Sequence, residues 1–151
     1  MYRKGHYGVA LLTFAPIGFA LVRAGEADLA FLTGATMLWL AMLPDVDHRL
    51  PLVSHRGVTH TLVFAALVGG VFAVVGALVG GALGSVVGFP PVAADGVLTG
   101  IGLAGFGFAL GALTVCTHLL GDVLTPSGVA LFWPLSSRRY TLDLAPAKSR
   151  L

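Results

Sequence analysis

The residues best suited to bind a metal are histidines and aspartates that share four short stretches of the sequence. These residues are His6, Asp45, Asp47, His48, His55, His60, His118 and Asp122. Imidazole nitrogens and carboxylate oxygens together suit zinc, iron or manganese better than calcium. His118 and Asp122 are four residues apart, so on a helix they would project from one face. The set is large enough for one or two divalent metals.

Four apolar segments must position these residues. Hydrophobic residues make up 56% of the 151 and charged residues 11%, against roughly 25% charged in soluble domains. The segments cover about 7–22, 27–43, 59–83 and 97–120. We predict an all-α, polytopic membrane helical bundle with about four transmembrane helices, a short first hairpin and an interfacial C-terminal segment. Residues 1–142 are expected to form one domain and 143–151 a short tail.

The basic residues predict the orientation of these helices. Eight of the nine precede the first segment, lie between the second and third, or follow the fourth: Arg3, Lys4, Arg49, Arg56, Arg138, Arg139, Lys148 and Arg150. Because positive loops stay in the cytoplasm, we expect a multi-pass protein of the cell membrane with both termini cytoplasmic. All five histidines would then lie at or near that face. The basic residues form no block, which argues against a nucleic-acid partner.

Glycines recur at four-residue spacing in the last two segments. They are Gly76, Gly80, Gly84, Gly88, Gly107 and Gly111. Small residues at this spacing let helix backbones approach closely in lipid. The spacing predicts close packing within one chain, or a homodimer face.

Several of the polar residues have simpler interpretations when taken alone. Asp45 and Asp47 could form a solvated turn, and His6 could be an interfacial residue. Arg56 could pair with one of these aspartates or hold an anionic substrate group. Thr59 is expected to cap the third helix. Ionisable groups near a membrane core are costly, however, and together on one face they indicate function.

The same stretches resemble a known family. Residues 44–48, 55–61 and 118–125, followed by Gly128 and Trp133-Pro134, are similar to the YdjM-like family of small inner-membrane proteins predicted to be metal-dependent hydrolases. The resemblance extends from His6 to about residue 142. It implies the metal ligands His6, Asp45, His60, His118 and Asp122.

The sequence lacks a zincin motif, a nucleophile elbow and a phosphate loop, so a metal-activated water is the remaining catalytic group. We expect a hydrolase that uses a divalent metal, zinc before manganese or iron, to cleave an ester or phosphoester of a lipid or amphipathic molecule. Asp47 is the expected general base, with His55 and Arg56 positioning the substrate. The alternatives are a non-catalytic metal-binding membrane protein, such as a sensor, scaffold or assembly factor, and a purely structural bundle.

Overall fold

The computed structural model describes residues 3–49, 56–86 and 102–145, and most of these are helical. The elements are α1 Arg3–Arg23, α2 Ala27–Trp39, the 3-10 helices η1 Pro44–Arg49 and η2 Val58–His60, α3 Leu62–Val86 and α4 Gly102–Val123. The described residues contain no strand beyond an isolated bridge between Val129 and Tyr140. This confirms the predicted all-α class.

Four segments are long and apolar enough to cross a membrane. They are Arg3–Arg23, Ala27–His48, Leu62–Val79 and Gly102–Val123. The first is longer than expected because its polar first turn continues the helix. The second combines α2 with η1, since the α-helix stops at Trp39. Residues 97–101 of the expected fourth segment lie outside the described residues.

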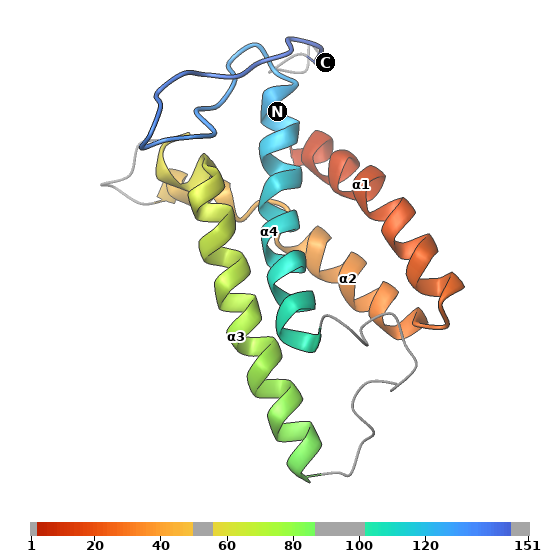
Figure 1. Cartoon of the computed structure of the whole chain (residues 1–151). Coiled ribbons are helices and arrows are strands. Elements are labelled where there is room, and N and C mark those ends of the chain that lie inside the picture. The colour runs from red at the N-terminus through yellow and green to blue at the C-terminus, as the bar shows by residue number, and fades with distance from the viewer. Residues whose placement is uncertain (1–2, 50–55, 87–101, 146–151) are drawn as a thin grey trace.

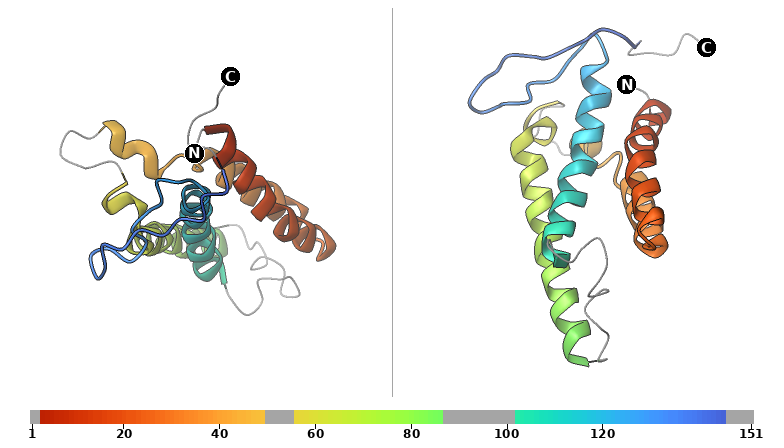
Figure 2. Two further views of the ribbon diagram at one scale, coloured as in Figure 1. Left: turned by 90° about the horizontal axis from the view of Figure 1, so that it is seen from above. Right: turned by 45° about the vertical axis from the view of Figure 1, so that its right-hand side comes forward.

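Helix α4 stands in the middle of the bundle, with α3 along one side and the α1–α2 hairpin along the other (Figure 1). The start of α1, the 3-10 helices, the end of α4 and the C-terminal segment gather at one end of the bundle (Figure 2). That end carries the described histidines and the aspartates of the predicted site. Along the helices many outward side chains are large and apolar, such as Leu12 and Phe31, which are 76% and 75% exposed. Such a surface suits contact with lipid.

Glycines bring α3 and α4 into close contact. A Cβ atom at Gly76 would collide with the carbonyl of Leu103, and one at Gly107 with the carbonyl of Phe72. Both helices therefore approach backbone to backbone, as the glycine spacing predicted for packing within one chain. A homodimer face remains a prediction.

A tight turn joins α1 to α2. Gly25 has φ +86°, and the N–H of Glu26 donates to the carbonyl of Leu21 at 2.9 Å while that of Gly25 donates to Val22 at 3.0 Å. This is a Schellman cap, in which glycine supplies the left-handed residue. The turn sends α2 back along α1, so the chain returns to the polar end of the bundle.

Candidate metal centre

Two 3-10 helices carry half of the site. Pro44 begins η1 after the four residues that follow α2, and η1 places Asp45 and Asp47 at the polar end of the bundle. His60 ends η2 and is fully buried. Thr61 then caps α3, because its hydroxyl accepts the N–H of Phe64 at 3.1 Å. The prediction that Thr59 caps this helix was therefore wrong: the helix begins at Leu62, so its N-cap position falls on Thr61.

Helix α4 carries the other half of the site in its last turns. His118 and Asp122 are buried, with exposed fractions of 1% each, and they project from the same face at i, i+4. The carboxylate Oδ2 of Asp122 lies 3.5 Å from Nε2 of His118. It also lies 3.4 Å from Nε2 of His60. The helix thus places both residues against the η2 histidine.

Three atoms that could bind one metal form a nearly equilateral triangle. The Nε2 atoms of His60 and His118 are 3.3 Å apart, and Oδ1 of Asp45 lies 3.3 Å from the first and 3.4 Å from the second. Zinc bonds to nitrogen and oxygen are about 2.0–2.2 Å long, so ligand atoms around a tetrahedral zinc lie about 3.3–3.5 Å apart. The triangle therefore has the dimensions of one face of a tetrahedral metal site.

The histidine tautomers direct lone pairs into this triangle. Nδ1 of His118 lies 2.7 Å from the carbonyl oxygen of Ala41, which can only accept, so Nδ1 must carry the proton. Nε2 of neutral His118 is then an acceptor. Because Nδ1 is the donor, the lone pair of neutral His118 is on Nε2 and faces His60 and Asp45 rather than the carbonyl of Ala41.

Asp47 gives His60 the same tautomer. Its Oδ2 lies 3.3 Å from Nδ1 of His60 and accepts the Thr59 hydroxyl at 2.9 Å. With the Thr59 proton used in this way, Nδ1 of His60 is the donor to the hydroxyl at 3.0 Å or to the carboxylate. Such outer-shell partners fix the orientation of metal-binding histidines. Asp47 thus contacts Nδ1 of His60, whereas Nε2 of the same ring belongs to the triangle.

Arg56 connects the two halves of the site. Its Nη2 donates to Oδ1 of Asp122 at 2.7 Å, and its backbone N–H donates to Oδ2 of Asp47 at 3.1 Å. Nη1 also reaches the carbonyl of Gly128 at 3.4 Å. Arg56 has φ +59°, a region that non-glycine residues seldom occupy. Its guanidinium pairs with Asp122 rather than with Asp45 or Asp47, the aspartates named from the sequence.

His6 lies behind the triangle. Its ring stacks on that of His118 with centroids 3.9 Å apart and planes within 3° of parallel. Its Nε2 is 3.7 Å from Oδ1 of Asp122. Gly121 makes room for the ring, since a Cβ atom there would lie 2.6 Å from Nδ1 of His6. His6, His118 and Asp122 therefore form a second group of possible ligands that shares two residues with the site.

The structure thus brings together all five residues that the family resemblance implied as ligands. His48 is exposed and groups with Asp45 and Asp47. His55, the expected substrate-positioning residue, lies outside the described residues. Sequence reasoning missed the carbonyl of Ala41 and the glycine at 121. The glycine gave a signal in its spacing, since it lies three residues after His118 and therefore near the same helical face; a backbone carbonyl gives none.

Comparison with known proteins identifies a family. The family model described as YdjM inner membrane protein matches residues 1–151, the whole chain. No curated protein and no solved structure gave a significant match.

Proposed function

Because the chain belongs to the YdjM inner membrane protein family, we propose that the cluster is the metal centre of a membrane-bound hydrolase. One observation carries the proposal. Nε2 of His60, Nε2 of His118 and Oδ1 of Asp45 converge at 3.3–3.4 Å, and when both histidines are neutral with the proton on Nδ1, none of the three atoms has a proton to donate. A shared cation stabilises such an arrangement, whereas buried acceptors that face one another without one are costly.

In this proposal Asp45, His60 and His118 hold the metal, which we take to be zinc, with manganese or iron as alternatives. Three protein ligands leave one position open, as in catalytic zinc sites. A divalent metal held by these residues would lower the pKa of a bound water towards about 7 and would polarise the bond to be cleaved. The substrate class is an ester or phosphoester of a lipid or amphipathic molecule.

The surrounding residues then have separate tasks. Asp47 fixes the tautomer of His60. Its contact with Nδ1 of His60 supports this role better than the role of general base. Asp122 has one oxygen beside both histidine nitrogens and the other held by Arg56. This position supports a role for Asp122 as the proton acceptor, which the sequence had suggested for Asp47. Asp45 is the accessible member of the triangle, with 20% of its side chain exposed against none for either histidine.

A second candidate is a non-catalytic metal-binding membrane protein, such as a sensor, scaffold or assembly factor. The position of Asp122 favours it, because an oxygen 3.4 and 3.5 Å from the two nitrogens could serve as a fourth ligand. Four protein ligands are typical of structural zinc sites. The role of Asp122 thus separates the two candidates.

Asp122→Asn therefore tests the function. The protein would be purified in detergent and assayed against phosphatidate, lysophospholipids and chromogenic esters, with and without a chelator. For a hydrolase we expect chelator-sensitive turnover in the wild type, and in the variant near-normal metal content with activity reduced about 100-fold or more. Asp28→Asn, an exposed aspartate in the first turn of α2, is the matched control. Loss of metal in the variant, with no wild-type turnover on any substrate, would contradict catalysis and support the second candidate.

The basic residues support a position for the site at the cytoplasmic face. Eight of nine lysines and arginines fall in regions that share one side of a four-span topology. A single cysteine introduced at Asp28 in a Cys116→Ser background should react with a membrane-impermeant reagent from the periplasmic side only. Labelling from the cytoplasmic side would reverse the orientation and contradict the proposed location.

A further inference from the structure

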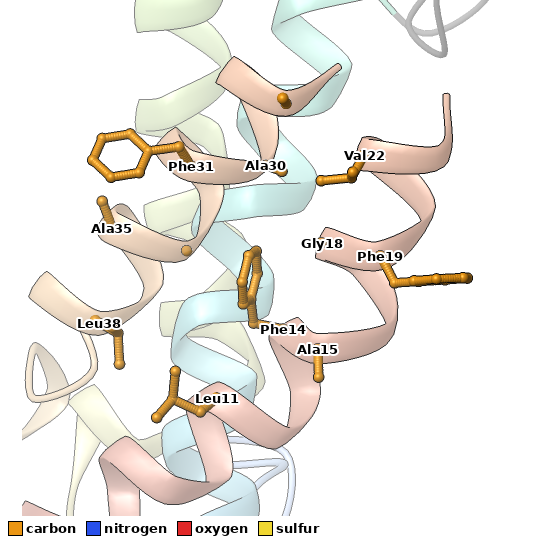
Figure 3. Close-up of a pocket in the computed structure, with 12 residues that line it drawn as sticks. Leu11, Phe14, Ala15, Gly18, Phe19, Val22, Ala30, Phe31, Ala35 and Leu38 are labelled. Carbon is orange, nitrogen blue, oxygen red and sulfur yellow. The ribbon is translucent and has the colours of Figure 1, made fainter. Parts of the chain in front are cut away.

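An apolar groove of about 680 Å³ runs between α1 and α2. Its lining contains no charged side chain and includes Leu11, Phe14, Ala15, Gly18, Ala35 and Leu38. Figure 3 shows the ring of Phe14 between the two helices, while Phe19 and Phe31 extend to either side. The ring rests on glycines, because a Cβ atom at Gly34 would lie 2.9 Å from it. The two helices are thus held apart by one aromatic ring, and space remains beside it.

The groove shares a lining residue with a pocket beside the metal centre. Leu38 also lines a second pocket of about 790 Å³ at the polar end of the bundle. That pocket contains the triangle residue Asp45, together with Arg3 and Tyr7 from the first turns of α1. Arg3 is exposed and has no ion-pair partner among the residues that the structure describes. The apolar groove therefore lies next to a pocket that contains a cationic side chain and the accessible metal ligand.

The groove is about as long as one leaflet is thick, and it begins eight residues along α1 from Arg3, a rise of about 12 Å. Its lining along α1 extends from Leu11 to Val22, and at 1.5 Å per residue these eleven steps span about 16 Å. One leaflet of a bilayer is about 15 Å thick, half of the hydrocarbon core of about 30 Å. Both helices belong to candidate membrane spans, so the apolar molecules available to this groove are the lipids around it.

We propose that the groove binds one acyl chain of an anionic membrane lipid and delivers its headgroup to the pocket beside Asp45. The phosphate or carboxylate of the headgroup pairs with Arg3, and the bond to be cleaved faces the metal centre. The cleavage step rests on the proposed function, but lipid binding does not. The substrate class is therefore narrowed from amphipathic molecules in general to a membrane lipid with an anionic headgroup.

Filling the groove tests the binding of the chain. Ala15 and Ala35 are exposed and line the groove, so phenylalanine at either position occupies it. Ala20 is equally exposed on α1 but does not line the groove, which makes Ala20→Phe the matched control. The probe is phosphatidate with a diazirine on one acyl chain, in phosphatidylcholine vesicles that contain the protein. Cross-linked peptides are quantified by mass spectrometry.

We expect the wild type to cross-link mainly at groove residues. Ala15→Phe and Ala35→Phe should lower the yield about tenfold, the effect of losing roughly two methylene contacts, while Ala20→Phe leaves it unchanged. Arg3→Gln should lower the yield for phosphatidate about fivefold relative to a phosphatidylcholine probe, as one basic residue near a membrane surface would. Cross-links spread evenly over the outward faces, or equal losses in Ala15→Phe and Ala20→Phe, would overturn the inference.

His118→Ala separates this inference from the proposed function. If the variant binds no metal but cross-links normally, the groove acts as proposed whether or not the protein is an enzyme. If the wild type hydrolyses a short water-soluble ester in a metal-dependent reaction but shows no groove cross-links, the lipid inference alone fails.

Discussion

Replacing Asp47 with asparagine should weaken metal binding although Asp47 lies outside the triangle of ligands. Its Oδ2 lies 3.3 Å from Nδ1 of His60 and accepts the Thr59 hydroxyl at 2.9 Å and the Arg56 N–H at 3.1 Å. Asparagine keeps the shape and one acceptor oxygen but removes the charge that favours a proton on Nδ1. Outer-shell substitutions of this kind typically cost 10–100-fold in metal affinity. That range corresponds to about 1.4–2.8 kcal/mol.

Asparagine is a better test than alanine. Asp47→Ala would leave the partly buried N–H of Arg56 without its acceptor, at a cost of about 1–3 kcal/mol in folding stability. A loss of metal in that variant could then reflect unfolding. Asp28→Asn serves as the control of equal chemistry, because Asp28 is exposed on α2 far from the site.

The assay is a competition titration. Metal-free protein in detergent is titrated with zinc in the presence of a chromogenic chelator, for the wild type, Asp47→Asn and Asp28→Asn. We expect the affinity of Asp47→Asn to fall within the tenfold to hundredfold range and that of Asp28→Asn to stay at the wild-type value. An Asp47→Asn affinity equal to that of the wild type would refute the assignment of Asp47 as the residue that orients His60.

Three further substitutions test other parts of the site and the bundle. Arg56→Lys keeps a charge beside Asp122, but a lysine has no planar fork with which to reach Gly128 as well. We expect the metal affinity to fall by about tenfold in the same titration. An unchanged affinity would count against the bridging role of Arg56. Gly121→Ala displaces the His6 ring. We expect thermal unfolding in detergent to show a loss of about 1–3 kcal/mol in stability, while the variant keeps its metal. If the variant lost the metal, His6 would be a ligand. Gly107→Leu forces α4 away from α3, and we expect a similar loss of stability; unfolding at the wild-type temperature would contradict the close backbone packing.

Much of the fold follows from the sequence because its physical causes are local. Long apolar segments must form helices in a bilayer, since lipid offers no partner for free backbone groups. Glycines recur every four residues from Gly76 in α3 and from Gly107 in α4, and this spacing is sufficient to predict the close contact between the two helices. The boundaries were less accurate, because apolar composition alone does not show that α1 continues through its polar first turn or that α2 gives way to η1 after Trp39.

The composition of the site was predictable, but its internal organisation was not. Histidines and aspartates of one membrane face could be expected to meet. Which of them contact one another depends on the path of η1 and η2, whose geometry has no periodic signal in sequence. For this reason Asp45 and Asp47 look equivalent in the sequence, although Asp47 contacts Nδ1 of His60 and Asp45 contacts Nε2. The stacking of His6 on His118 likewise depends on how α1 leans against α4.

Metal content is the most direct test of the proposal that imidazoles and carboxylates from separate parts of the chain share a cation. The wild type, His60→Ala, His118→Ala and Asp28→Asn would be purified in detergent under identical conditions and measured by elemental analysis. We expect about one zinc or other divalent metal per chain in the wild type and in Asp28→Asn, and a loss in both histidine variants, since removal of one ligand breaks the triangle. Metal below about 0.3 per chain in wild-type protein resupplied with zinc, manganese or iron, or equal metal content in all four proteins, would contradict the metal centre.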